Sequence, residues 1–137
     1  MNRKELRSLA QIRLSEAKAL LKMGYPDGAY YLAGYSVECA LKACIAGQTK
    51  RYDFPDKRKV EASHTHNLKD LMRIANLHEA HLEQAKKDAG FRNNWDLVQQ
   101  WSEHSRYERH AADLARGLVD AVGHSEHGVM AWITQHW

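Results

Sequence analysis

The chain has 137 residues, of which 44% are hydrophobic and 27% are charged, a composition typical of one globular domain rather than of a disordered chain. Its formal net charge of +3 is a mild bias toward anionic partners and excludes a histone-like basic tail. No apolar run approaches the ~20 residues that a membrane span needs, and the charged start MNRKELRSLA lacks the apolar segment of a signal peptide. We therefore expect a single cytoplasmic domain over residues 1–137, with no membrane segment.

Two amphipathic helices are predicted over the first 47 residues. The first runs from about Asn2 to Met23, where leucines and alanines recur at three- and four-residue steps, and Gly24 ends it. The second runs from about Asp27 to Ala46 and has a stripe of small residues flanked by tyrosines and aliphatic side chains. Because its flanks are also apolar, we expect this helix to be buried on most sides and to be the central one.

The two cysteines, Cys39 and Cys44, lie five residues apart in the second predicted helix. That spacing corresponds to a rise of ~7.5 Å along a helix axis, whereas a disulfide prefers Cα atoms within ~6.8 Å of each other. We therefore expect two reduced and largely buried thiols, as in a cytoplasmic protein.

The middle of the chain is predicted to be a charged loop followed by one or two helices. Residues 48–65 contain a proline and many charges and are expected to form the loop, with Ser63 or Thr65 as the cap of the next helix. That helix carries an apolar stripe that starts at Leu68. Residues 78–90 either continue it or form a short separate helix.

The last third is predicted to contain a loop and a final helix. Residues 91–107 are expected to be a loop with a helical turn, and the final helix is expected to open near Arg106. Its apolar period continues past Gly123 and Gly128, which either bend or break the helix. Helices joined by short turns, with only two prolines and no strand pattern, predict an all-α, up-and-down bundle of four to five helices.

Four short segments follow one another in an order that is characteristic of a known family. They are AYYLAGYSVECALKACIAG at 29–47, HNLKDL at 66–71, SRY at 105–107 and GVMAWI at 128–133. In the first segment, a stripe of aromatic and small residues leads to Glu38, Leu41 and Lys42. Together, in order and spacing, the four segments resemble the HEPN domains.

The resemblance to HEPN domains implies a fold, a set of partners and a possible activity. HEPN domains are four- or five-helix bundles that often form dimers. Many small prokaryotic ones are encoded beside a minimal nucleotidyltransferase in a toxin–antitoxin-like pair, and others bind nucleotides or RNA. The catalytic branch consists of metal-independent endoribonucleases, whose site is an Arg followed after four to six residues by a His. The resemblance therefore implies a homodimer, a nucleotidyltransferase partner, an RNA or nucleotide ligand, and no cofactor.

The corresponding position in this chain reads Arg106-Tyr107-Glu108-Arg109-His110. A His near its ordinary pKa can transfer protons, and a fixed Arg can stabilise charge on a scissile phosphate. Only three residues separate Arg106 from His110, which departs from the spacing of the catalytic branch, although on a helix the two would still share a face. Three interpretations stay open: a catalytic pair, a phosphate-binding role shared with Arg109, or a helix-opening Arg beside a surface His.

Glu38 is a candidate for a structural ion pair. It precedes Lys42 by four residues, the favoured order for a helix pair, but it also neighbours the apolar stripe at Val37. Because a buried carboxylate requires a partner, we expect Arg106 to pair with Glu38 and so to bridge the second and last helices.

The charged loop is a second candidate for nucleic-acid binding. Arg51 and Arg58 could track a phosphate backbone while Tyr52 and Phe54 stack on a base. Interspersed acidic residues dilute the charge, so a solvated loop is the alternative.

No metal site is expected, because the histidine pairs lack further ligands. These pairs are His78 with His81 and His124 with His127. The four tryptophans would mark a dimer or partner surface if they lie outside the core.

Three functions follow from these patterns. The preferred one is a binding module that holds a nucleotide or RNA and acts with a nucleotidyltransferase partner. The alternatives are a metal-independent endoribonuclease toxin that uses Arg106 and His110, and a non-catalytic helical dimer that serves as an interaction module. The short spacing between Arg106 and His110 favours the first over the second, so we expect weak or no catalysis.

Overall fold

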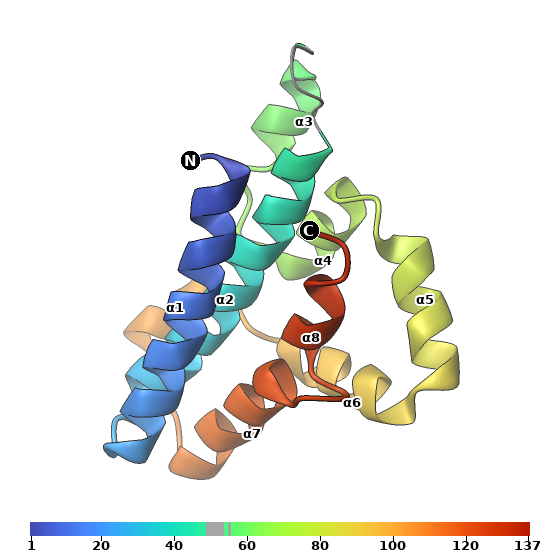
Figure 1. Ribbon diagram of the computed structural model, residues 1–137. Helices are drawn as coiled ribbons and strands as arrows, with labels where there is room; N and C mark the ends of the chain where they lie inside the picture. Colours follow the sequence, from blue (N-terminus) through green and yellow to red (C-terminus); the bar gives the residue numbers. More distant parts are fainter. Residues whose placement is uncertain (49–53, 55) are drawn as a thin grey trace.

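The computed structural model describes residues 1–48, 54 and 56–137, and this part of the chain is helical without any strand (Figure 1). Its helices are α1 (Arg3–Lys22), α2 (Pro26–Gly47), α3 (Lys57–Ala62), α4 (Leu68–Ile74), α5 (His78–Lys87), α6 (Ala89–Val98), the 3₁₀-helix η1 (Glu103–Tyr107), α7 (Ala112–Gly123) and α8 (Val129–Ile133). The all-α prediction is confirmed. The described residues form eight α-helices, however, and not four or five, because several expected helices and loops are divided into shorter helices.

The first two helices form an antiparallel hairpin, as their sequence patterns predict. Asn2 and Glu5 close a reciprocal capping box at the start of α1. Gly24 adopts a positive φ of 88° after the end of α1, a conformation that glycine adopts without steric cost. Pro26 then occupies the first turn of α2, where its missing N–H is not needed.

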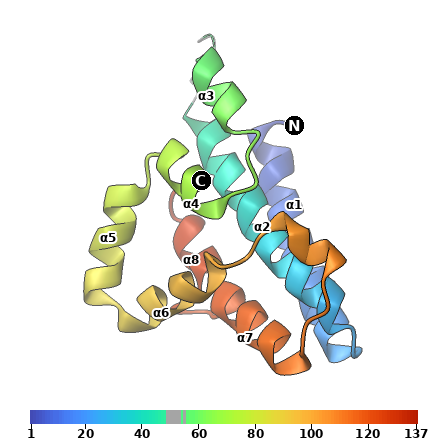
Figure 2. The same cartoon turned by 180° about the vertical axis from the view of Figure 1, so that it is seen from behind.

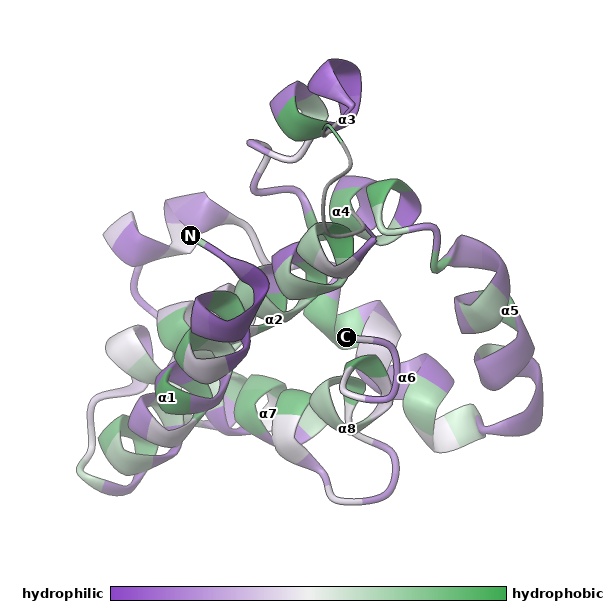
Figure 3. Ribbon diagram, turned by 45° about the horizontal axis from the view of Figure 1, so that its top comes forward, coloured by the Kyte–Doolittle hydropathy of each residue, from purple (hydrophilic) through white to green (hydrophobic). Residues whose placement is uncertain are grey.

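Helix α2 is the central element, which confirms the prediction from its composition. It packs against α1, α4, η1, α7 and α8, and its middle stretch is buried on nearly every side. The small residues on α2 allow close packing: a Cβ placed on Gly34 would lie 2.2 Å from the ring of Trp101. Figure 3 shows the hydrophobic residues gathered where α1, α2, α7 and α8 face one another.

The segment 48–65 is not wholly a loop. Within its described part, α3 forms after Asp56, whose carboxylate accepts a hydrogen bond from the Arg58 N–H. The cap of α4 is Asn67 and not Ser63 or Thr65, since the Asn67 side chain accepts the N–H of Asp70. Thr65 instead accepts the N–H of Asn67, one step earlier in the turn.

The prediction of a loop with a helical turn over residues 91–107 is wrong for the first half of the segment, which is helical. Helix α6 begins after Asp88, whose side chain caps the Phe91 N–H at 3.0 Å. Phe91, Trp95 and Val98 are all buried. Their spacing of four and three residues is a helical signal, although the residues between them are mostly polar. Helix α5 is separate from α4, which is one of the two arrangements that the sequence left open.

The final helix starts later than predicted and is broken. Helix α7 begins at Ala112, because the chain leaves η1 in an extended conformation at Glu108. It ends at Gly123, and Gly128 precedes α8. A Cβ on Gly128 would lie 2.3 Å from the carbonyl oxygen of His124, so this tight reversal requires glycine. Figure 2 shows α8 turned away from the direction of α7.

Three of the four tryptophans belong to the core. Trp95, Trp101 and Trp132 are 5%, 3% and 5% exposed, so they do not form a partner surface. Helices α3 and α5 contribute no buried residue and lie at the periphery of the fold (Figure 1). Within the described residues, no helix is both long and apolar enough to cross a membrane.

Candidate functional site

Arg106 and His110 do not share a helix face in the structure. Arg106 lies in η1, and His110 lies in the link between η1 and α7. The expectation that both side chains project from one helix is therefore wrong. Ser102 caps η1 by accepting the N–H of His104, which favours this short separate helix over an early start of α7.

His110 is held in place by contacts to α2 and to η1. Its ring stacks on Tyr30 with centroids 3.9 Å apart and planes 16° apart, and its backbone N–H donates to Asp27. The ring Nε2 lies 3.3 Å from the carbonyl oxygen of Ser105. Because a carbonyl oxygen only accepts, this hydrogen bond places a proton on Nε2 and leaves Nδ1 as the only ring nitrogen that could act as a base.

Arg106 is an exposed cation beside two tyrosines. Its guanidinium carbon lies 4.9 Å from the centre of the Tyr107 ring, and the neighbouring Tyr107 and Tyr31 side chains raise the pKa of Arg106 above its ordinary value. Among the described residues, Arg106 forms no ion pair with a carboxylate. Its charge is therefore available to an anionic ligand.

Glu38 is buried as expected but has different partners. Its carboxylate lies 3.3 Å from Lys42 Nζ and 2.9 Å from His66 Nδ1, so the predicted pair with Arg106 is not formed. His66 also approaches Glu103 through Nε2 at 3.2 Å. His66, which precedes the Asn67 cap of α4, thus links α2 to η1. The sequence indicated this residue only as part of the segment HNLKDL.

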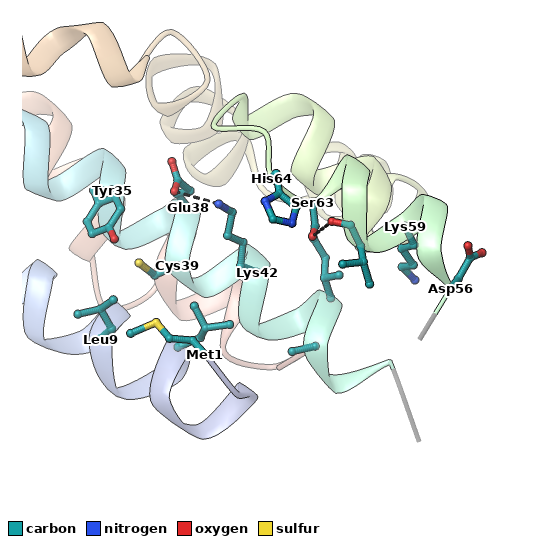
Figure 4. Close-up of a pocket in the computed structure, with 14 residues that line it drawn as sticks. Met1, Leu9, Tyr35, Glu38, Cys39, Lys42, Asp56, Lys59, Ser63 and His64 are labelled. Carbon is teal, nitrogen blue, oxygen red and sulfur yellow. Dashed lines mark hydrogen bonds and ion pairs between the residues drawn. The ribbon is translucent and has the colours of Figure 1, made fainter. Parts of the chain in front are cut away.

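A cavity of about 580 Å³ lies between α1, α2 and α3. Figure 4 shows Tyr35, Glu38, Cys39 and Lys42 projecting from α2 toward this cavity, and His64 facing it from beyond α3. Burial raises the pKa of Tyr35 to about 12 and that of Cys39 to about 11. Both groups are therefore neutral at physiological pH, and Cys39 is an unreactive thiol.

The apolar wall of the cavity comes mainly from α1 and the end of α2. Leu6 and Leu9 line it from α1, and Ile45 lines it from α2. Lys42 and Lys59 are the basic groups at its border. The cavity therefore combines an apolar surface with two lysines and with the carboxylates of Glu38 and Asp56.

A row of aromatic rings connects this cavity with Arg106. The Tyr31 ring lies 6.0 Å from Tyr35 and 6.0 Å from Trp101, in stacked orientations. Tyr35 lines the cavity, whereas Tyr31 adjoins Arg106. We call Tyr31, Tyr35, Lys42, Arg106 and Tyr107 the α2 face.

The other predicted basic residues contribute less. Arg109 is exposed in the link before α7, and Arg58 is exposed on α3 outside the cavity lining. Arg51 lies outside the described residues. In the described part of the chain, no group of three or more His, Cys, Asp or Glu side chains is placed to hold a metal ion.

Comparison with known proteins identifies the family. The model of the HEPN domain family matches residues 4–122, a region that spans α1 to α7 and contains Glu38, His66, Arg106 and His110. The segment 128–133, which also resembles the family, lies outside the match. Comparisons with curated proteins and with solved structures found no match. Because the family model covers most of the chain, from α1 through α7, this protein belongs to the HEPN domain family.

Proposed function

We propose that this HEPN-domain protein is a binding module that holds RNA or a nucleotide on the α2 face. The observation that carries the proposal is Arg106, an exposed cation without an acidic partner in the described chain, beside the stacked rings of Tyr31 and Tyr35. Proteins that bind single strands combine cations for the phosphates with aromatic side chains on which bases stack. Tyr31 and Lys42 are eleven residues apart on α2, a rise of ~16 Å, so the face is long enough for a short oligonucleotide.

The contacts of His110 favour binding over cleavage. Stacking on Tyr30 and the hydrogen bond to the Ser105 carbonyl fix the ring and occupy Nε2. Catalysis by this His would depend on Nδ1 alone, and a misplacement of ~1 Å can reduce a rate about 100-fold. We therefore propose that the pair Arg106 and His110 does not work as an efficient ribonuclease site.

The proposal extends to a partner. Family membership supports, as a hypothesis, that this chain acts with a nucleotidyltransferase in a toxin–antitoxin-like pair. The mild positive charge of the chain is compatible with an anionic ligand shared between the two proteins.

The binding proposal is tested by fluorescence anisotropy with a labelled single-stranded RNA. We expect binding that weakens as salt rises, because phosphate contacts release counterions. Arg106→Ala should weaken it about tenfold, as expected for the loss of a charged hydrogen bond. Arg116→Ala is the matched control: it removes the same charge from an exposed pair with Asp113 on α7 and should leave binding unchanged. Equal effects of the two substitutions would contradict a site at Arg106.

The ribonuclease alternative is tested by incubating the same RNA with the protein in EDTA. We expect no cleavage. Robust cleavage in EDTA that is lost in both Arg106→Ala and His110→Ala would establish the ribonuclease function in place of the binding module.

A further inference from the structure

A second cavity, of about 370 Å³, lies between α4, α5 and α6 and shares no lining residue with the first. Lys69 and Arg73 line it from α4, and His78 and His81 line it from α5. The third wall consists of Trp95 on α6 and Gln99, the residue that follows the last turn of α6. The HEPN resemblance implies no role for this cavity, and the RNA binding proposed for the α2 face does not involve it.

The lining of this cavity carries hydrogen-bond donors and no carboxylate. Lys69 and Arg73 can only donate. Asp70 binds one arm of Arg73 at 3.2 Å on the exposed side of α4, which leaves further N–H groups of the guanidinium unused. Asp96 is close enough to influence His81, but it does not line the cavity. A ligand that fits must therefore supply acceptors, as an oxyanion does.

His81 is the unusual group in this lining. Its ring packs edge-on against Phe91, Trp95 and Trp132, with centroids 5.7, 5.3 and 6.3 Å away. Both ring nitrogens are shielded and have no hydrogen-bond partner among the described groups. Burial, reinforced by the charge of His78, lowers the pKa of His81, so the ring is neutral and carries one donor and one acceptor.

Buried polar groups are nearly always hydrogen-bonded, and exceptions call for an explanation. A half-turn of the imidazole about its Cβ–Cγ bond exchanges the nitrogens with ring carbons and leaves the outline of the ring unchanged. His81 lines the cavity, so a half-turn of this kind is how its N–H would reach an acceptor there while the ring keeps its contacts with Phe91, Trp95 and Trp132.

We propose that this cavity binds a small aromatic oxyanion, with the phosphate or carboxylate held by Lys69, Arg73 and His81 and the ring placed against Trp95. The volume is that of a small-molecule site rather than of a macromolecular groove. The site shares no residue with the α2 face, so it stands independently of the proposed RNA binding.

The test is a titration of the full-length protein with phenyl phosphate, benzoate and inorganic phosphate. Binding is followed by calorimetry and by the ¹H–¹⁵N spectrum of the His81 imidazole. We expect one saturable site for phenyl phosphate or benzoate, with a shift of the His81 resonances, and weaker binding of inorganic phosphate, which lacks the ring. The tighter of the two aromatic probes identifies phosphate or carboxylate as the group that the site recognises. No saturable binding of either aromatic probe would overturn the proposal.

Three variants locate the site. Arg73→Ala, at an exposed position, should weaken the tighter probe about tenfold, whereas Arg116→Ala should leave its affinity unchanged. His81→Phe should also weaken binding but should not lower the melting midpoint of the free protein, because it preserves the ring and removes the unpartnered nitrogens. Unchanged affinity in Arg73→Ala, or a lower melting midpoint in His81→Phe, would refute the proposal. Unaltered RNA binding by Arg73→Ala would separate this site from the α2 face.

Discussion

Glu38 is a carboxylate with only 3% of its surface exposed, and it is held between a lysine of its own helix and a histidine that precedes α4. Lys42 and His66 both remain partly exposed. The buried charge is therefore paired with Lys42 and hydrogen-bonded to His66, both of which keep contact with water, and this lowers the cost of desolvation compared with a fully buried pair. The network connects α2, the start of α4 and, through Glu103, η1.

At this residue we predict that Glu38→Ala lowers the free energy of unfolding by about 1.5–3 kcal/mol, the range for hydrogen bonds to a charged group. The loss stays below that of a fully buried pair because Lys42 and His66 can be hydrated after the substitution. Chemical denaturation measures the change. Glu16→Ala is the control, since it removes a half-exposed pair with Arg13 within one helix and should cost less than ~1 kcal/mol. Equal losses in both variants would show that Glu38 behaves as a surface charge.

At the scale of the elements, the contact between α2 and the segment after α6 depends on Gly34, which has no side chain. The Trp101 ring lies against Gly34 so closely that a Cβ would meet three of its atoms within 2.3 Å. Gly117 on α7 is different, because a Cβ there would meet only Leu97, at an ordinary 3.7 Å. Gly34 is therefore required by close packing, whereas the site of Gly117 has room for a side chain.

We predict that Gly34→Ala destabilises the protein by about 1–3 kcal/mol, the cost of overpacking a filled core, and displaces Trp101. Gly117→Ala, its matched control, should stabilise by about 0.5–1 kcal/mol, because alanine is favoured over glycine inside a helix. Thermal unfolding followed by tryptophan fluorescence gives both values. A neutral or positive effect of Gly34→Ala would contradict the close contact with Trp101.

The link between α7 and α8 is fastened to the start of α6 by an ion pair. His127 Nδ1 lies 2.8 Å from Asp88 Oδ2, and the His127 carbonyl accepts a hydrogen bond from Asn94. The hydrogen bond with Asp88 raises the pKa of His127, and the same bond, with the Phe91 N–H, lowers the pKa of Asp88. The broken final helix is therefore held in place by a pair that depends on pH.

We predict that the destabilisation caused by His127→Ala varies with pH. The contribution of His127 is complete below the ordinary His value of 6.5 and is lost as pH rises through its raised pKa. The contribution of Asp88 is complete above its ordinary value of 3.8 and is lost as pH falls through its lowered pKa. The difference in melting midpoint between wild type and variant should therefore be largest between pH 3.8 and 6.5.

Melting curves recorded from acidic to alkaline pH test the His127 prediction. His104→Ala serves as the control, because His104 is exposed and forms no ion pair in the described part of the chain. A pH-independent difference for His127→Ala would show that the ion pair does not hold the link.

At the scale of the whole molecule, three of the four tryptophans lie in the core, and other apolar groups lie at the surface. Tyr25, Tyr107 and Leu114 are 58%, 77% and 46% exposed. Exposed apolar side chains mark an interface only where they are contiguous. The dimer implied by the HEPN resemblance must therefore use a surface other than the one that the tryptophans suggested.

We predict that the protein is a homodimer at tens of micromolar concentration. Tyr107, which is 77% exposed, is the most exposed aromatic side chain of the α2 face, so Tyr107→Ser should weaken association. Sedimentation velocity distinguishes the dimer from the monomer directly. A single boundary with the coefficient of a monomer would contradict the prediction for wild type.

The candidate site was only partly predictable from the sequence. The sequence placed Glu38 beside the apolar stripe, and its burial is confirmed, because α2 packs against five other elements and is buried on most sides. It did not reveal that His66 pairs with Glu38, since that contact joins residues 28 positions apart. Nor did it reveal the cavity at His81, whose walls come from three helices.

The sequence by itself determined the helical class, the limits of α1 and α2 and the central place of α2. These follow from periodicity, caps and glycine stops, which act within a few residues. Only the tertiary structure decided where α7 begins, that the final helix breaks before α8, and that Arg106 and His110 lie on different elements. Those features depend on contacts between distant residues, such as the stack of Tyr30 on His110 and the pair of Asp88 with His127, and tertiary packing of this kind overrides local preference.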